Sequence, residues 1–292
     1  MGHEFVQLLV NGLGMGLIYV LLAVGFNLIL SIPQILFMAY GQFYMLGAYV
    51  IWGMLVAWQK PFILSIAVAV LVPAMLGALA YRLVFQRIQH SEKRFLANIV
   101  AAIGIMMILG QGALLLFGTE SRGLSSVFPG MIDVAGIRIS MEKVVLILLS
   151  LIVAVCIYFI LKRTNIGRAM RAVSFRADVA SLQGVNANRT YLMTIVLACA
   201  ISGFAGGIMA PVFAISPAMG GIILPVMFII ILGGIGSMMG AIIGGLILGM
   251  TTAFGQYYIG SGVAQILLYA VIGIILFFRP GGLFGKAEEM GL

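Results

Sequence analysis

The longest polar interval between the apolar runs of this chain is residues 162–189, which we call the basic segment. It has the sequence KRTNIGRAMRAVSFRADVASLQGVNANR, with six basic residues and one acid. Such a density of cations can fix the orientation of a membrane protein, attract anionic lipid, or contact a soluble partner protein. These three interpretations stay open on charge alone.

The apolar residues of the basic segment favour docking to a partner. We predict two short helices, 167–174 and 175–183, broken near Ser174 and ended by Gly184, because glycine readily adopts the left-handed conformation that ends helices. Small apolar side chains alternate with the arginines, and a segment that only attracts lipid would not need them. They are Ala169, Ala172, Ala177, Ala180 and Leu182.

Neutral polar residues in apolar runs form the second candidate site. No charged residue occurs between Phe5 and Gln59 or between Thr190 and Phe278, so a zwitterionic solute would need a wet path lined by neutral dipoles. The alternative is that these side chains only hydrogen-bond between helices. The candidates for the path are Tyr40, Gln42, Tyr44, Ser216 and Pro217.

Catalytic and cofactor motifs are absent from the sequence. Gly285 and Lys286 are followed by Ala287, so no phosphate-binding loop for ATP is present. The two histidines, His3 and His90, cannot form a metal site or an intramembrane proton relay. We therefore expect no enzyme activity, no cofactor and no metal, and a chain that is either a passive channel or one subunit of a pump.

Composition places the chain in a membrane. It is 63% hydrophobic and 8% charged, and apolar runs of about 20 residues recur from end to end. We predict a single domain over residues 1–292, an all-α polytopic transmembrane helical bundle of about eight or nine spans, with broken or re-entrant helices between 222 and 254. The expected spans are 6–30, 35–58, 62–81, 95–117, 144–161, 191–215, 222–235, 238–254 and 264–278.

The positive charge is confined to a few loops, which sets the expected orientation. Residues 81–94 have a net charge of +3 and the basic segment +5, so both are expected in the cytoplasm. The N-terminus with Glu4 and the loop 118–143 are then periplasmic, and Arg279 and Lys286 place the C-terminus inside. This distribution argues against nucleic-acid binding.

Glycines spaced four apart predict close contacts between helices of this chain. They are Gly203 with Gly207, and Gly236 with Gly240 and Gly244. Backbones can nearly touch where side chains are this small. We expect tight packing within the chain, and a subunit interface is the alternative.

Several runs together resemble one family. G-R-A-x-R-A from Gly167 and A-D-V-A-x-L-x-G-V-N resemble the cytoplasmic coupling loop of permeases of ABC importers, most closely the shorter branched-chain amino acid permease. GLIYVLLAVGFNLIL, G-Q-x-x-M-L-G-A-Y at 41–49, ANIVAAIGIMMILGQGALLLFG at Ala97 and ILGGIGSMMGAIIGG at Ile231 extend the resemblance. It implies ATPase-coupling roles for Gly167, Arg168, Ala169, Arg171, Ala172, Ala177, Ala180, Leu182, Gly184 and Asn186.

The resemblance also implies partners and a location. A homologous second permease would complete the path, two ABC ATPase subunits would dock on the coupling loops, and a periplasmic binding protein would deliver amino acid at the bacterial inner membrane. The sequence departs from the family where an Asn and a His usually precede Gly41, since Met38, Ala39 and Tyr40 stand here. Urea, amides or other amino acids therefore stay alternative substrates, and a self-sufficient channel or facilitator is the alternative class.

Overall fold

The computed structural model describes residues 2–89, 93–124, 126–134 and 137–278. Helices make up most of this part of the chain, which confirms the predicted polytopic helical class. The chain divides into two compact units whose segments alternate along the sequence. One unit comprises Met1–Asn27, Ser126–Ile152 and Leu224–Leu292, and the other comprises Leu28–Ser125 and Val153–Ile223.

Among the described residues, six helices are long and apolar enough to cross a membrane. Their positions confirm six of the predicted spans, because hydropathy over about 20 residues is a strong local signal. They are α1 (Gly2–Ser31), α3 (Phe62–Ala80), α5 (Arg94–Phe117), α6 (Met141–Arg163), α9 (Ala187–Met209) and α11 (Met238–Tyr258). A π-helical segment, η2 (Tyr81–Phe85), and a short helix, α4 (Gln86–Ile88), continue α3 without a break.

Two of the three remaining predicted spans are interrupted in the structure. Instead of beginning at 35, α2 (Tyr40–Trp52) starts after a turn in which Gln34 has φ 55°, and a π-helical segment, η1 (Gly53–Ala57), extends it. The predicted span 222–235 consists of a 3₁₀ segment, η3 (Pro217–Ile222), followed by α10 (Ile223–Gly233). The sequence predicted broken or re-entrant helices between 222 and 254, whereas the interruptions lie before α2 and at η3, and α11 is continuous through the second half of that range. The last helix is α12 (Ser261–Phe278), and residues 279–292, with Arg279 and Lys286, lie outside the described part.

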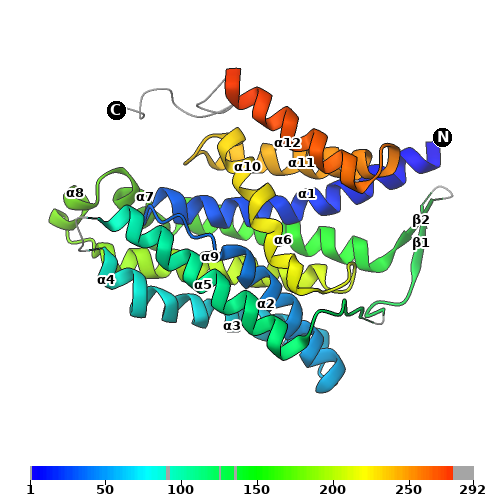
Figure 1. Cartoon of the computed structure of the whole chain (residues 1–292), viewed down its shortest axis with the longest axis horizontal. Coiled ribbons are helices and arrows are strands. Elements are labelled where there is room, and N and C mark those ends of the chain that lie inside the picture. Colours follow the sequence, from blue (N-terminus) through cyan, green and yellow to red (C-terminus); the bar gives the residue numbers. More distant parts are fainter. Residues whose placement is uncertain (1, 90–92, 125, 135–136, 279–292) are drawn as a thin grey trace. The chain divides into compact units, whose positions relative to one another are not determined.

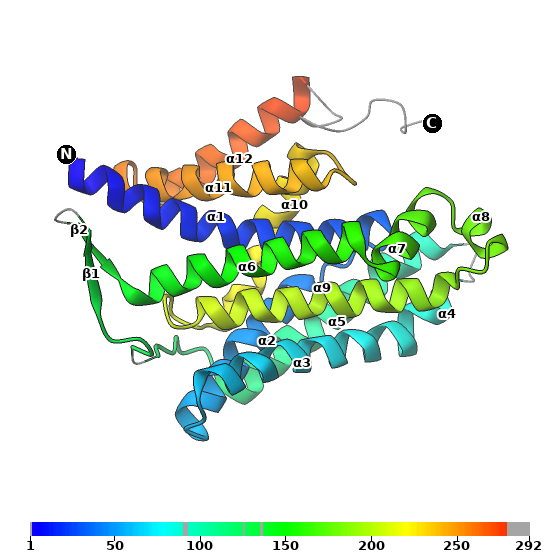
Figure 2. The same cartoon turned by 180° about the vertical axis from the view of Figure 1, so that it is seen from behind.

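In the second unit, α2, α3 and α9 lie side by side (Figures 1 and 2). Glycines make this approach possible, since a Cβ atom on Gly47 would overlap the carbonyl oxygen of Gly203, and one on Gly206 would overlap that of Tyr44. A Cβ on Gly203 would overlap the carbonyl of Ala69. Gly203 and its neighbours thus pack within the chain, as their spacing predicted.

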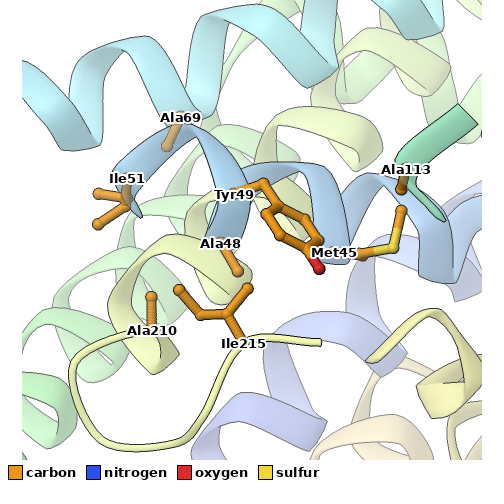
Figure 3. Close-up of a cluster of buried hydrophobic side chains, with 8 residues drawn as sticks. All are labelled: Met45, Ala48, Tyr49, Ile51, Ala69, Ala113, Ala210 and Ile215. Carbon is orange, nitrogen blue, oxygen red and sulfur yellow. The ribbon is translucent and has the colours of Figure 1, made fainter. Parts of the chain in front are cut away.

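A cluster of buried apolar side chains fills the space where these helices meet (Figure 3). Small residues dominate it, and Tyr49 is its one large aromatic member, stacked on Phe117 with ring centroids 4.1 Å apart. Alanines let the helices approach closely, while the tyrosine and isoleucines fill the remaining volume. The cluster consists of Met45, Ala48, Tyr49, Ile51, Ala69, Ala113, Ala210 and Ile215.

In the first unit, α1, α10, α11 and α12 also pack through glycines (Figure 2). A Cβ on Gly240 would overlap the carbonyl of Gly233, and one on Gly245 would come within 2.8 Å of the Val20 nitrogen. Gly236, which the spacing placed in the same helical series, instead lies in the turn between α10 and α11 with φ 84°. Its N–H donates to Asn27 Oδ1 at 2.9 Å, and this bond fixes the turn.

The predicted turn-rich loop 118–143 contains an antiparallel hairpin that the sequence did not reveal. Its strands are β1 (Met131–Val134) and β2 (Ile137–Ser140), paired from Met131 with Ser140 to Val134 with Ile137. Strands of four residues give too short an alternation to identify from sequence. Where the hairpin meets α6, Lys143 donates to Asn11 Oδ1 at 2.8 Å.

Candidate functional site

The basic segment folds into two short helices, α7 (Asn165–Phe175) and α8 (Ala177–Leu182), between α6 and α9 (Figure 2). The predicted pair of helices is confirmed, but the break falls at Arg176, whose backbone is extended, two residues after Ser174. Thr164 shapes the corner with α6 by accepting from the Gly167 N–H at 3.2 Å and donating to the Ile160 carbonyl at 2.6 Å. Gly184 has φ 83°, the left-handed conformation expected after a helix end.

Several of the residues predicted to dock a partner instead support the segment itself. Gly167 is buried, and a Cβ there would overlap the carbonyl of Leu161. The Arg171 guanidinium donates to the same carbonyl, Ala180 is 3% exposed, and Asn186 caps α9 by accepting from the Arg189 N–H at 3.0 Å. These residues therefore pack closely or form hydrogen bonds within the chain itself.

Other side chains of the basic segment are free to meet a partner. Leu182, one of the predicted docking residues, is 88% exposed, and Phe175, which the sequence reasoning missed, is 83% exposed. The signal available in the sequence was the spacing of Met170 and Val173, which lie three residues apart and therefore share one face of α7. That face is buried, and Phe175 falls on another face of the helix. Arg168 and Gly184 are exposed, Val179 and Ile166 are 47% and 44% exposed, and Ala169, Ala172 and Ala177 are half-buried.

The second candidate site centres on the Gln42 side chain, in the first turn of α2. The residue is 9% exposed, and its amide lies between α5 and η3: a Cβ on Gly110 would be 3.6 Å from Nε2, and one on Gly220 would overlap Nε2. Gly41 packs against the Gly220 carbonyl in the same way. Within the described residues, Gln42 Oε1 has no hydrogen-bond partner. A buried amide oxygen without a partner is costly, so a transient ligand or water would stabilise it.

The other predicted path residues surround this amide to different degrees. Tyr40 and Tyr44 are 1% and 2% exposed, and the Tyr40 carbonyl accepts from Ser202 Oγ at 3.1 Å. Ser216 and Pro217 are half-buried and start η3, the segment whose Gly220 contacts Gln42. The structure therefore brings Gln42 to the segment that Pro217 begins, while the two tyrosines are part of the α2 packing.

This arrangement can bind polar groups through hydrogen bonds. A side-chain amide between bare backbone segments presents two N–H donors and one carbonyl acceptor, without any charge. Among the described residues, no cluster of His, Cys, Asp and Glu could hold a metal ion. Hydrogen bonding to a neutral polar group is what this geometry supports.

Known proteins of one family are similar to this chain over nearly its whole length. The model of the family described as "Branched-chain amino acid transport system / permease component" matches residues 8–279. The high-affinity branched-chain amino acid transport system permease protein BraD of Pseudomonas aeruginosa is 26% identical over 98% of this chain and 97% of its own length. The corresponding LivH protein of Escherichia coli is 28% identical over 97% and 96%.

Similarity also extends to an archaeal protein and to one solved structure. The probable branched-chain amino acid transport permease protein LivH of Methanocaldococcus jannaschii is 27% identical over 91% of this chain and 88% of its own. The structure of PsaBC from Streptococcus pneumoniae in complex with Fab matches with a TM-score of 0.53 and 15% identity, over 96% of each chain. That structure supports the fold alone.

Proposed function

Because this chain belongs to the family of permease components of branched-chain amino acid transport systems, we propose that it is one membrane subunit of an ATP-driven importer. In this proposal it forms the translocation path with a homologous second permease. Two ABC ATPase subunits dock on the cytoplasmic side, and a periplasmic binding protein delivers a branched-chain or related amino acid. The chain lies in the bacterial inner membrane with its N-terminus in the periplasm and its C-terminus in the cytoplasm.

The exposed apolar side chains of the basic segment are the observation that supports this function best. Phe175 and Leu182 are among the most exposed large side chains, and they belong to a polar segment outside the candidate spans. Burying such a side chain fully stabilises a structure by about 1.5–3 kcal/mol, so two of them give a partner a useful hydrophobic contact. The basic charges around them suit an acidic partner surface. A self-sufficient channel has no use for this surface.

A reconstitution experiment separates the importer from the channel. We expect purified chain in lipid vesicles to pass no amino acid by itself, and vesicles with the second permease and the ATPases to accumulate leucine only with ATP and a binding protein. The measurement is uptake of labelled leucine, with labelled urea tested in parallel. Conduction by the chain alone would support the channel instead, and uptake of urea but not leucine would replace the substrate.

In the same proposal, the Gln42 amide contacts the passing substrate. We expect Gln42→Leu to change the uptake rate or the substrate preference by several-fold, because one or two hydrogen bonds to the solute are lost. The variant should be at least as stable as the native chain, since a buried oxygen without a partner is replaced by an apolar group of similar size. Uptake kinetics and thermal unfolding of the same preparation test both expectations.

The matched control for this experiment is Gln265→Leu, which removes an exposed amide from α12. It should leave uptake unchanged. If Gln42→Leu lowers the unfolding temperature while leaving the uptake kinetics unchanged, the amide is only a contact between helices.

A further inference from the structure

A cavity of about 440 Å³ lies beside the first turns of α9, in the second unit. On the other side it is bounded by Tyr81 and Arg82 of η2 and by Gln86 of α4. From α9, Asn188 and Arg189 contribute polar groups and Leu192 an apolar surface. Figure 2 shows α4 beside the start of α9. The helices α7 and α8 lie at the same end of this unit. Residues distant in sequence thus form a pocket that includes the C-terminal end of the basic segment.

The charge of this pocket is positive and unopposed. Arg82 and Arg189 both line it, and no acidic residue does. Within the described part of the chain, neither guanidinium has an ion pair or a hydrogen bond to a protein group. Both side chains are exposed, so water screens part of their mutual repulsion, and an anion between them would remove the rest. Their planar arrays of N–H donors match the oxygens of a phosphate group.

Neutral groups of the pocket point to the same ligand. The Tyr81 side chain is 1% exposed, and its hydroxyl has no hydrogen-bond partner among the described residues. A buried hydroxyl of this kind is stabilised when a ligand oxygen accepts its proton. The positive end of the α9 dipole also lies here, and the Asn186 cap satisfies the Arg189 N–H of the first turn.

We propose that this pocket binds a phosphate group, of the kind that the headgroup of an anionic phospholipid supplies. The arginines would hold the phosphate oxygens, Tyr81 and the amides of Gln86 and Asn188 would bond the remaining polar atoms, and Leu192 would contact the apolar part of the lipid. Basic pockets between transmembrane helices on the cytoplasmic side bind anionic headgroups in this way. Bound lipid would hold η2 against α9, the helix that the basic segment leads into.

Native mass spectrometry of the full chain tests the proposal. The chain is released from nanodiscs of phosphatidylcholine with phosphatidylglycerol, and the retained phosphatidylglycerol is counted for the native sequence and for Arg82→Gln with Arg189→Gln. Because charge-assisted hydrogen bonds are lost, we expect retention to fall about tenfold or more. The matched control, Arg87→Gln with Arg94→Gln, removes the same charge outside the pocket and should retain the lipid.

A second arm distinguishes lipid from free phosphate. In nanodiscs of phosphatidylcholine alone, inorganic phosphate that raises the unfolding temperature of the native chain, but not of the pocket variant, would assign the pocket to a soluble phosphate compound. Should the double variant fail to accumulate, Tyr81→Phe replaces it and should lower retention several-fold. Two results would overturn the proposal. One is an equal loss of phosphatidylglycerol from the pocket and control variants; the other is unchanged lipid retention in the pocket variant together with no effect of inorganic phosphate on the unfolding temperature.

Discussion

Replacing Gly206 by alanine is expected to prevent the folded protein from accumulating in the membrane. The added methyl group would overlap the carbonyl oxygen of Tyr44 and lie 3.2 Å from the Ala48 nitrogen, so α2 and α9 would have to move apart. Both obstacles are backbone atoms, which cannot rotate away as a side chain can. Overpacking in a well-packed interior costs about 1–3 kcal/mol and occasionally more, and separating helices also opens the apolar cluster around Ala48.

The measurement is the amount of chain in isolated membranes and its thermal unfolding in detergent. Gly104→Ala and Gly112→Ala are the matched controls, because they add the same methyl group to helical positions with nothing within 4 Å. Alanine is about 1 kcal/mol better than glycine in a helix, so these variants should be neutral or slightly more stable. A Gly206→Ala chain as abundant and stable as the controls would contradict the tight contact between α2 and α9.

Replacing Phe175 and Leu182 together by serine is expected to lower ATP-driven uptake more than tenfold while leaving the amount of chain in the membrane unchanged. Both side chains are over 80% exposed, so the folded chain loses little packing when they are removed. The loss of contact with the ATPase, at about 1.5–3 kcal/mol for each apolar side chain, corresponds to at least a tenfold decrease in affinity. This expectation rests on the proposed function.

Co-purification of the ATPase with the tagged permease, together with uptake in vesicles, measures the effect. Met131→Ser on β1 is the control, because it removes another large side chain, which is 72% exposed and belongs to the loop that is predicted to lie in the periplasm. It should keep both ATPase binding and uptake. Normal recruitment and uptake by the Phe175 and Leu182 variant would show that the ATPase docks elsewhere or that the segment only sets orientation.

The sequence by itself determined the class of this protein and the approximate positions of its long helices. Runs of apolar residues identify spans such as α5 and α6 because the bilayer demands a fixed length of apolar chain. Local backbone preferences also acted where expected, since α1 ends just before Pro33 and the left-handed Gly184 follows α8. The spacing of Gly203 and Gly207 was sufficient to indicate close packing, since only small side chains permit it.

Only the tertiary structure decided which residues meet. Nothing local distinguishes Ala180, which is buried, from the exposed Leu182 beside it on α8, because the facing direction of a short helix depends on what it packs against. In the same way, the contact of Gln42 with Gly220 joins residues far apart in the sequence, and it requires α2 to begin at Tyr40 and η3 to begin at Pro217. Hydropathy and turn preferences act over a few residues, whereas such contacts arise when whole helices settle against one another.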